Sequence, residues 1–278
     1  LFVFDMGIEG IALATILGQI LSSLLAAYYL VRKARTFKLR KNDFFPKLQN
    51  IKAIFGLGIS AFTTHILATI VQIVSINSLK HYGALSKYGS EIAIAASGAV
   101  SKAMIVFMSS VLGIALGCQP IYGYNYGSKR YDRVKETYLL AIRYGTTIAV
   151  IAFLVLQLFP RPILSLFGSN DPLFYEFGSR YIRIFLFMTF INSLHPTTST
   201  FFTALGKAHI GFWLALMRQG VILLPLMLIL PRFMGIDGLL FAGPITDGIA
   251  AIVVIILGLW QVRTLTRMQE SSVSEKTI

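Results

Sequence analysis

The chain has 278 residues, of which 55% are hydrophobic and only 13% are charged, and its mean hydropathy is +0.71. A soluble domain of this size carries about 25% charged residues, so the composition excludes an ordinary soluble globular protein or enzyme. The net charge of +13 does not indicate a nucleic-acid partner, because Lys and Arg lie mostly in short segments between long apolar runs. The sequence therefore predicts an all-α, polytopic membrane protein whose surroundings are the lipid bilayer.

Seven apolar segments are long enough to cross a bilayer core of about 30 Å as helices. In chain order they cover residues 7–31, 54–79, 92–120, 138–159, 181–205, 209–230 and 237–262. Barrel strands are excluded, because the segments are too long and their apolar residues do not alternate. The predicted parts are a transmembrane helix from a first repeat (1–35), a basic loop (36–53), a six-helix lobe (54–262) and a tail (263–278).

The basic residues predict the orientation of these spans. They gather in the segment 32–52, after the third span and after the last span, and all of these regions fall on one side of the membrane. The positive-inside rule places that side, with the C-terminus, in the cytoplasm. The predicted location is a cell membrane, crossed several times.

A short motif occurs twice. The sequence Met-Gly-Ile-Glu-Gly at 6–10 recurs as Met-Gly-Ile-Asp-Gly at 234–238, and each copy opens an apolar span that ends in basic residues. If these two spans are equivalent last helices of two repeats, a complete six-helix repeat lies between them, as in many secondary transporters. We therefore expect a natural protein of about twelve spans, with the missing N-terminal lobe as a partner of this chain.

Polar side chains inside the predicted spans are candidates for function, because a charge at the bilayer centre costs roughly 2.5–3.5 kcal/mol on insertion scales. Lys102 and Arg218 are each interpreted either as a cation lining a cavity or as a structural contact. Asp247, which follows Pro244, is either a protonatable site or the partner in a hydrogen bond between helices. The candidate residues for a substrate cavity or for ion coupling are Gln72, Asn77, Lys102, Asn192, His195, Arg218 and Asp247.

The remaining candidates are uncharged or titrate near neutral pH. His195 precedes Pro196 in the fifth span, with Asn192 one turn earlier. A membrane histidine can carry a proton at physiological pH, and the alternative is a packing role. Gln72 and Asn77 lie in the second span, where such amides either join helices by hydrogen bonds or contact a substrate.

Motifs typical of enzymes are absent from the sequence. It contains no Gly-x-x-x-x-Gly-Lys-[Ser/Thr] phosphate loop, no His-Glu-x-x-His and no Gly-x-Ser-x-Gly, and its one cysteine cannot form a paired zinc motif. The chain is predicted not to be an enzyme and to have no catalytic residue, no bound cofactor and no metal site.

Several stretches carry a resemblance to a known family. Residues 113–135, Gly-Ile-Ala-Leu-Gly-Cys-Gln-Pro-Ile-Tyr-Gly-Tyr-Asn-Tyr-Gly-Ser-Lys-Arg-Tyr-Asp-Arg-Val-Lys, resemble the segment after the eighth helix of bacterial multidrug and toxic compound extrusion (MATE) transporters. Further likenesses follow in the right order, at Phe-Phe-Thr-Ala-Leu-Gly-Lys (201–207), Arg218-Gln219 with Pro225, Pro-Ile-Thr-Asp (244–247) and Gly-Ile-Glu-Gly (7–10). The resemblance covers residues 6–263, which would be the sixth to twelfth helices of the family.

The resemblance implies export of small organic, often cationic, compounds in exchange for a coupling cation, Na⁺ or H⁺. Some family members carry acidic cation-site residues in the seventh and tenth helices, whereas residues 54–79 and 181–205 contain no Asp or Glu. His195 lies near the position of the tenth-helix acid, and Gln72 lies close to the other. The alternatives are a lipid-linked saccharide flippase of the same superfamily, in which Lys102 and Arg218 would meet a pyrophosphate, and a fragment that does not transport.

Overall fold

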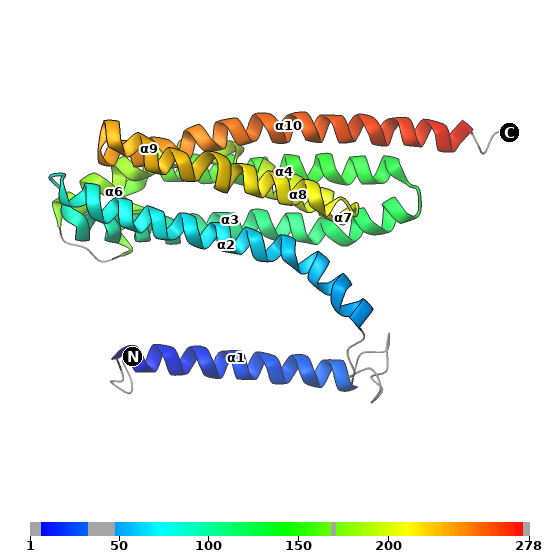
Figure 1. The fold of residues 1–278 in the computed structure, drawn as a ribbon, viewed down its shortest axis with the longest axis horizontal. Coiled ribbons are helices and arrows are strands. Elements are labelled where there is room, and N and C mark those ends of the chain that lie inside the picture. The colour runs from blue at the N-terminus through cyan, green and yellow to red at the C-terminus, as the bar shows by residue number, and fades with distance from the viewer. Residues whose placement is uncertain (1–6, 33–47, 168–170, 275–278) are drawn as a thin grey trace. The chain divides into compact units, whose positions relative to one another are not determined.

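The computed structural model describes residues 7–32, 48–167 and 171–274. It divides into two units, Leu1–Phe55 and Gly56–Ile278, each of which is described by itself. Most of the predicted basic loop 36–53 lies outside the described residues, as do residues 1–6 and 275–278. All regular elements in the described ranges are helices (Figure 1), which confirms the all-α prediction.

The smaller unit contains α1, which runs from Gly7 to Arg32. Its stretch Ala12–Tyr29 is apolar and long enough to cross a membrane. Glu9 lies in the first turn, where a carboxylate interacts favourably with the positive end of the helix dipole. The first predicted span, 7–31, is therefore a single helix.

The rest of the chain is a succession of helices, of which the part from Gly56 onward forms the larger unit. They are α2 (Leu48–Ala84), α3 (Gly89–Gly127), α4 (Tyr131–Leu158), α5 (Pro160–Ser165), α6 (Pro172–Phe185), α7 (Leu194–Ala204), α8 (Ala208–Ala215), α9 (Leu224–Met234) and α10 (Ile236–Ser274). Within the described ranges, 6 stretches of helix are long and apolar enough to cross a membrane. The segment predicted as a span at 181–205 is not among them, because it is divided between α6 and α7.

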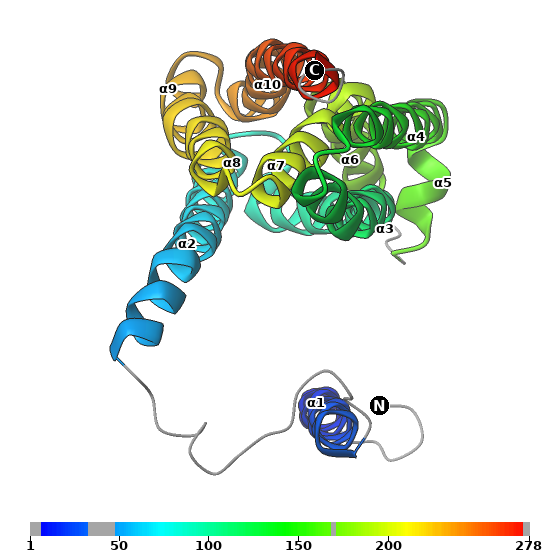
Figure 2. The same cartoon turned by 90° about the vertical axis from the view of Figure 1, so that its right-hand side faces the viewer.

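Helix α7 lies in the interior of the larger unit. It packs against α3, α4, α8 and α10, and Figure 2, which looks along the helices, shows it among them. Aromatic packing fixes its position, since the Phe201 ring stacks on Tyr138 of α4 with 4.2 Å between ring centroids. The Tyr138 and Thr198 hydroxyls are hydrogen-bonded at 2.9 Å. Residues at the start of α7 therefore face the middle of the bundle.

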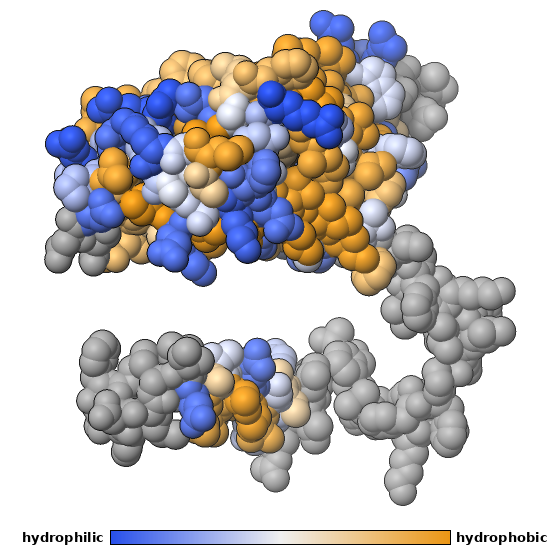
Figure 3. Space-filling model, turned by 60° about the vertical axis from the view of Figure 1, so that its left-hand side comes forward, coloured by the Kyte–Doolittle hydropathy of each residue, from blue (hydrophilic) through white to orange (hydrophobic). Residues whose placement is uncertain are grey.

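The surface of the larger unit is that of a protein in lipid. Large apolar side chains are exposed along its helices, including Val106, Leu154, Ile252 and Leu259. Figure 3 shows a broad hydrophobic flank beside an end covered by hydrophilic side chains. Exposed apolar surface of this extent is unfavourable in water but suits a bilayer.

Ion pairs hold the end of the larger unit where α6 begins. Lys87, between α2 and α3, binds Glu176 of α6, and the Tyr88 hydroxyl donates a hydrogen bond to the same carboxylate at 3.0 Å. Arg180 binds Asp237, at the start of α10, at 2.7 Å. The hydrogen bonds from Lys87 and Tyr88 hold the pKa of Glu176 below its ordinary value. The resulting stabilisation is present at neutral pH and is lost as the pH falls through that lowered pKa.

Two glycines of the repeated motif have a clear structural role between α9 and α10. Gly235 has φ +59° and ψ −140°, a conformation that essentially only glycine adopts. A Cβ on Gly238 would lie 2.4 Å from the Leu230 carbonyl oxygen and 2.6 Å from the Pro231 nitrogen, both of which are backbone atoms. The turn therefore requires glycine at both positions.

We expect Gly238→Ala to destabilise the protein, because the main chain of α9 cannot yield to the added methyl group as a side chain could. Overpacking of this kind costs about 1–3 kcal/mol, and thermal unfolding in detergent measures it. The matched control is Gly98→Ala in α3, where nothing lies within 4 Å of the new Cβ. Equal unfolding temperatures for the two variants would contradict this account of the turn.

Candidate functional site

A cavity of about 310 Å³ lies inside the larger unit, between α3, the region around α6 and α7, and α10. Most of its walls are apolar, but five polar or charged side chains of the fifth, sixth and last predicted spans also line it. The lining residues are Met104, Met108, Phe185, Leu186, Asn192, His195, Pro196, Arg218, Leu223, Gly243, Thr246 and Asp247. This is the candidate functional site.

An ion pair with a third polar partner forms the charged part of the cavity. The Arg218 guanidinium donates two hydrogen bonds to one carboxylate oxygen of Asp247, from Nη2 at 2.7 Å and from Nε at 3.1 Å. The same Nη2 donates to Oδ1 of Asn192 at 3.4 Å. The Arg218 and Asp247 side chains are 22% and 12% exposed. Arg218, Asp247 and Asn192 therefore join three segments of the chain that lie apart in the sequence.

A π-helix presents Arg218 to this cavity. Residues Leu216–Leu223 (η3) form it between α8 and α9, and the Leu224 N–H bonds to the Gln219 carbonyl, five residues earlier. Pro225 explains the widened turn, because it has no N–H to donate and its ring clashes with the carbonyl four residues earlier. Single π turns of this kind often occur at functional sites.

A break in the fifth span presents Asn192 and His195. Between the end of α6 at Phe185 and the start of α7 at Leu194, only a 3₁₀ turn over Thr189–Ile191 (η2) is regular. Gln157 of α4 compensates for part of the break, because its side-chain amide donates to the Arg183 carbonyl at 3.2 Å and lies 3.5 Å from that of Ile182. Irregular backbone at membrane depth is tolerated where protein groups satisfy it in this way.

His195 adds to the cavity a nitrogen atom that can accept a hydrogen bond or a proton. Its Nε2 atom is buried and has no hydrogen-bond partner among the described residues, and the same holds for Oε1 of Gln219, the residue after Arg218 in the sequence. Buried polar atoms are usually paired, so an unpaired imidazole nitrogen beside a cavity is a group that can accept a proton or a ligand. The site thus combines a paired guanidinium and carboxylate with an imidazole whose Nε2 atom is unpaired.

Four of the predicted candidates meet in this cavity, and three do not. Asn192, His195, Arg218 and Asp247 line it. Gln72, Asn77 and Lys102 are exposed and outside it, so any role for them remains a prediction. Lys102 lies two residues beyond buried Val100, and two residues turn a helix to its opposite face.

Some lining residues were missed by the sequence analysis. Met104 and Met108 were not singled out, although they follow buried Val100 at steps of four, the spacing of one helix face. Thr246 and Phe185 also line the cavity, and no pattern in the sequence distinguishes them from ordinary packing residues. Gln157 was missed because its role depends on the packing of α4 against the end of α6, which the sequence does not reveal.

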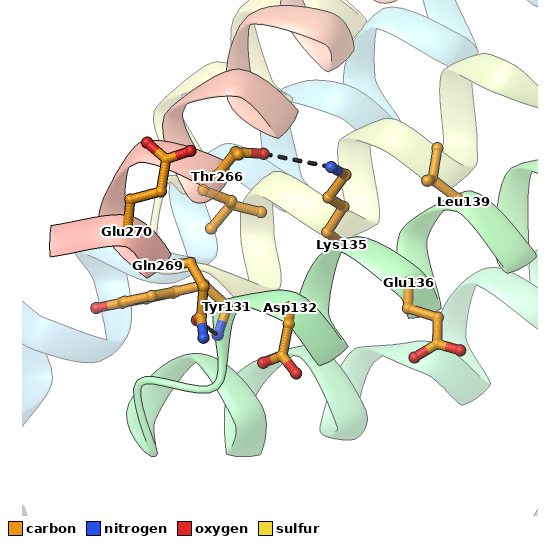
Figure 4. Close-up of a pocket in the computed structure, with 9 residues that line it drawn as sticks. Tyr131, Asp132, Lys135, Glu136, Leu139, Thr266, Gln269 and Glu270 are labelled. Atoms are coloured by element: carbon orange, nitrogen blue, oxygen red, sulfur yellow. Dashed lines mark hydrogen bonds between the residues drawn. The ribbon is translucent and has the colours of Figure 1, made fainter. Parts of the chain in front are cut away.

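A second hollow, of about 380 Å³, lies between the start of α4 and the end of α10 and contains none of the predicted residues. Figure 4 shows the Lys135 ammonium pointing to the Thr266 hydroxyl, 3.3 Å away, and not to Asp132 or Glu136. The Tyr131 N–H also bonds to the Gln269 side chain, at 3.2 Å. These bonds attach the end of α10 to α4.

We expect the Arg218–Asp247 pair to stabilise the fold through mutual pairing. Arg218→Gln or Asp247→Asn alone leaves a charge buried without its partner, which costs about 3–5 kcal/mol. The double variant restores much of this loss, because two neutral amides can bond to each other. A double-mutant cycle of unfolding free energies measures the coupling.

The control for this cycle is the Arg180–Asp237 pair, which has the same 2.7 Å contact but side chains that are 44% and 29% exposed. Its coupling should be smaller, since exposed ion pairs contribute little. If both cycles give the same coupling free energy, burial does not strengthen the Arg218–Asp247 pair.

Comparison with known proteins identifies relatives of this chain. Multidrug export protein MepA of Staphylococcus aureus is 22% identical over 260 residues, which cover 92% of this chain and 55% of that protein. A FAD transporter of Shewanella oneidensis is 24% identical over 264 residues, which cover 89% of this chain and 54% of that protein. The chain therefore spans about half the length of the curated relatives it matches.

Solved structures share the fold. A transporter of the MOP superfamily from Pyrococcus furiosus superposes with a TM-score of 0.81 at 21% identity, over 95% of this chain and 58% of that one. An outward-facing multidrug resistance transporter of the MATE family gives a TM-score of 0.79 at 21% identity, over 96% of this chain and 59% of that one.

The profile of the MatE family matches residues 61–229, which contain α3 to α8, the π-helix and most of α2 and α9. This range includes Asn192, His195 and Arg218. Since the match extends over more than half of the sequence, this chain belongs to the MatE family of membrane transporters.

Proposed function

We propose that this protein exports small organic compounds, often cationic, from a bacterial cell in exchange for a coupling cation. The observation that carries the proposal is the cavity in which Arg218, Asp247, Asn192 and His195 meet inside an otherwise apolar bundle of a MatE family member. Charges at this depth are costly and typically mark substrate or ion pathways. The names of the bacterial relatives, a multidrug exporter and a FAD transporter, support export of organic molecules.

Between the two expected coupling ions, the chemistry of the cavity favours H⁺ over Na⁺. Among the described residues, Asp247 is the only carboxylate that lines this cavity, and it is already bonded to Arg218. The Nε2 atom of His195 has no hydrogen-bond partner among the described residues, and an imidazole nitrogen with a lone pair can accept a proton but is not a ligand that Na⁺ prefers. We therefore propose that proton binding at this cluster is coupled to transport.

The saccharide flippase alternative has less support. A flippase of this kind needs a cationic cavity for a pyrophosphate, to which Lys102 and Arg218 were the expected contributors. Lys102 is exposed and outside the cavity, and the Arg218 charge is compensated by Asp247. The proposed export moves a molecule without a chemical reaction, so it requires no cofactor or catalytic residue. In the proposed topology the C-terminus lies in the cytoplasm, as the positive-inside rule predicts.

We expect ethidium to leave vesicles containing the protein, in its natural length, when an H⁺ gradient alone is imposed. A difference of about one pH unit supplies about 1.4 kcal/mol, or roughly a tenfold concentration ratio for each proton exchanged. Ethidium fluorescence measures the efflux, and vesicles with an equal Na⁺ gradient are the comparison. Efflux driven only by Na⁺ would overturn the choice of ion, and no efflux under either gradient would contradict export of this compound.

We expect His195→Gln to abolish efflux driven by the H⁺ gradient, because the amide retains hydrogen bonding but cannot be protonated. The matched control is His209→Gln, which changes an exposed histidine at the start of α8. Ethidium binding, followed by fluorescence polarisation, should be similar in both variants, because the substitution removes coupling and not the cavity. Normal proton-driven efflux by His195→Gln would exclude His195 as the coupling group.

A further inference from the structure

Another hollow of the larger unit is a groove of about 600 Å³ on its outer surface. It lies between α10 and the end of α6 with the residues that follow it. Its walls are apolar, formed by Phe187, Met188, Ile245, Gly248, Ile249 and Ile252. Several of these are exposed, with Phe187 at 50% and Ile252 at 61%. The groove is separate from the cavity that contains Arg218 and His195.

Two features of the sequence produce this groove. Gly248 has no side chain, and a Cβ placed there would meet only the Met188 methyl group, at 3.9 Å. The break after α6 interrupts the helix that would otherwise run alongside α10. The groove therefore exists because α10 has a glycine on one wall and the helix on the other wall is interrupted.

The length of the groove matches one leaflet of a bilayer. Its α10 wall extends from Phe241 to Ile252, which corresponds to about 16 Å of helix at 1.5 Å per residue. Half of a hydrocarbon core of about 30 Å is about 15 Å. One acyl chain in a single leaflet is thus the right length for this wall.

A positive charge lies at the end of the groove nearest the membrane surface. Arg183 lines the groove, is exposed, and belongs to none of the ion pairs found among the described residues. Arg180, one turn earlier, binds Asp237 in the first turn of α10. Arg183 is therefore at the end where α10 begins, and the remaining walls of the groove extend from it toward the bilayer centre.

We propose that this groove binds an anionic phospholipid, with its phosphate on the Arg183 guanidinium and one acyl chain along α10. Guanidinium groups recognise phosphate through paired hydrogen bonds. A headgroup with net negative charge is preferred, because a zwitterionic lipid carries its own cation beside the phosphate. Arg183 lies in the last turn of α6, where the negative end of the helix dipole also stabilises a positive charge. The dipole does not explain the apolar groove beside it.

The lipid would contact the break in the fifth span. Phe187 and Met188 follow α6 directly, and Asn192 and His195 of the candidate site lie one to two turns further along the same segment. A bound chain would pack against the outer side of this segment, with the internal cavity on its other side. The proposal does not depend on which compound or ion is transported.

The test is native mass spectrometry of the protein, in its natural length, with phosphatidylglycerol or phosphatidylcholine added at equal concentration. We expect phosphatidylglycerol to remain bound preferentially. Arg183→Gln should lower its retention about fivefold, the effect of one basic residue near an anionic membrane surface. Gly248→Phe should abolish retention, since its ring fills the groove while its Cβ fits without a clash.

Two substitutions serve as controls. Arg232→Gln removes an exposed arginine at the end of α9, and Ile256→Phe enlarges a side chain of α10 that is 60% exposed and lies outside the groove. Both should retain phosphatidylglycerol as the unaltered protein does. Equal retention of the two lipids, or unchanged retention in Arg183→Gln or Gly248→Phe, would overturn the proposal. A protein dimer that Gly248→Phe dissociates, with no dependence on lipid, would assign the groove to a second copy instead.

Discussion

The buried ion pair between Arg218 and Asp247 is the interaction around which the interior of the larger unit is arranged. Lipid offers no hydrogen bonds, so a charge inside this bundle must find its partner within the protein. The two side chains meet at 2.7 Å, with Asn192 as a third member. Three predicted spans are therefore held in one mutual orientation by groups that cannot be separated without a large cost.

The irregular segments of the larger unit serve this arrangement. The π-helix before Pro225 carries Arg218, and the break between α6 and α7 carries Asn192 and His195. Regular helices on both sides pack in the ordinary way around Phe201 and Tyr138. Departures from helical geometry are thus concentrated where polar groups must be turned toward the cavity, and the bonds that Gln157 donates limit their cost.

Much of the fold could be predicted from the sequence, because lipid imposes strong rules on composition and length. Apolar runs predicted the helices, and polar or charged residues within those runs predicted four of the residues that line one cavity. Their pairing could not be predicted, since hydropathy locates Arg218 and Asp247 along their own helices but says nothing of the rotation of one helix against another. The break at 186–193 was also missed, because its residues are mostly apolar, although Pro196 at the start of α7 has no N–H and its ring clashes with the carbonyl four residues earlier.

The Gln157 amide has a further consequence for movement. If the fifth span straightened, the Phe187 N–H, which now bonds to the Ile184 carbonyl, would compete for the Arg183 carbonyl to which Gln157 donates. The displaced amide would then be left in an apolar environment without a partner, which is unfavourable. The two halves of the span are therefore expected to move as separate rigid segments, joined by residues 186–193 as a permanent hinge and not as a helix that melts and reforms.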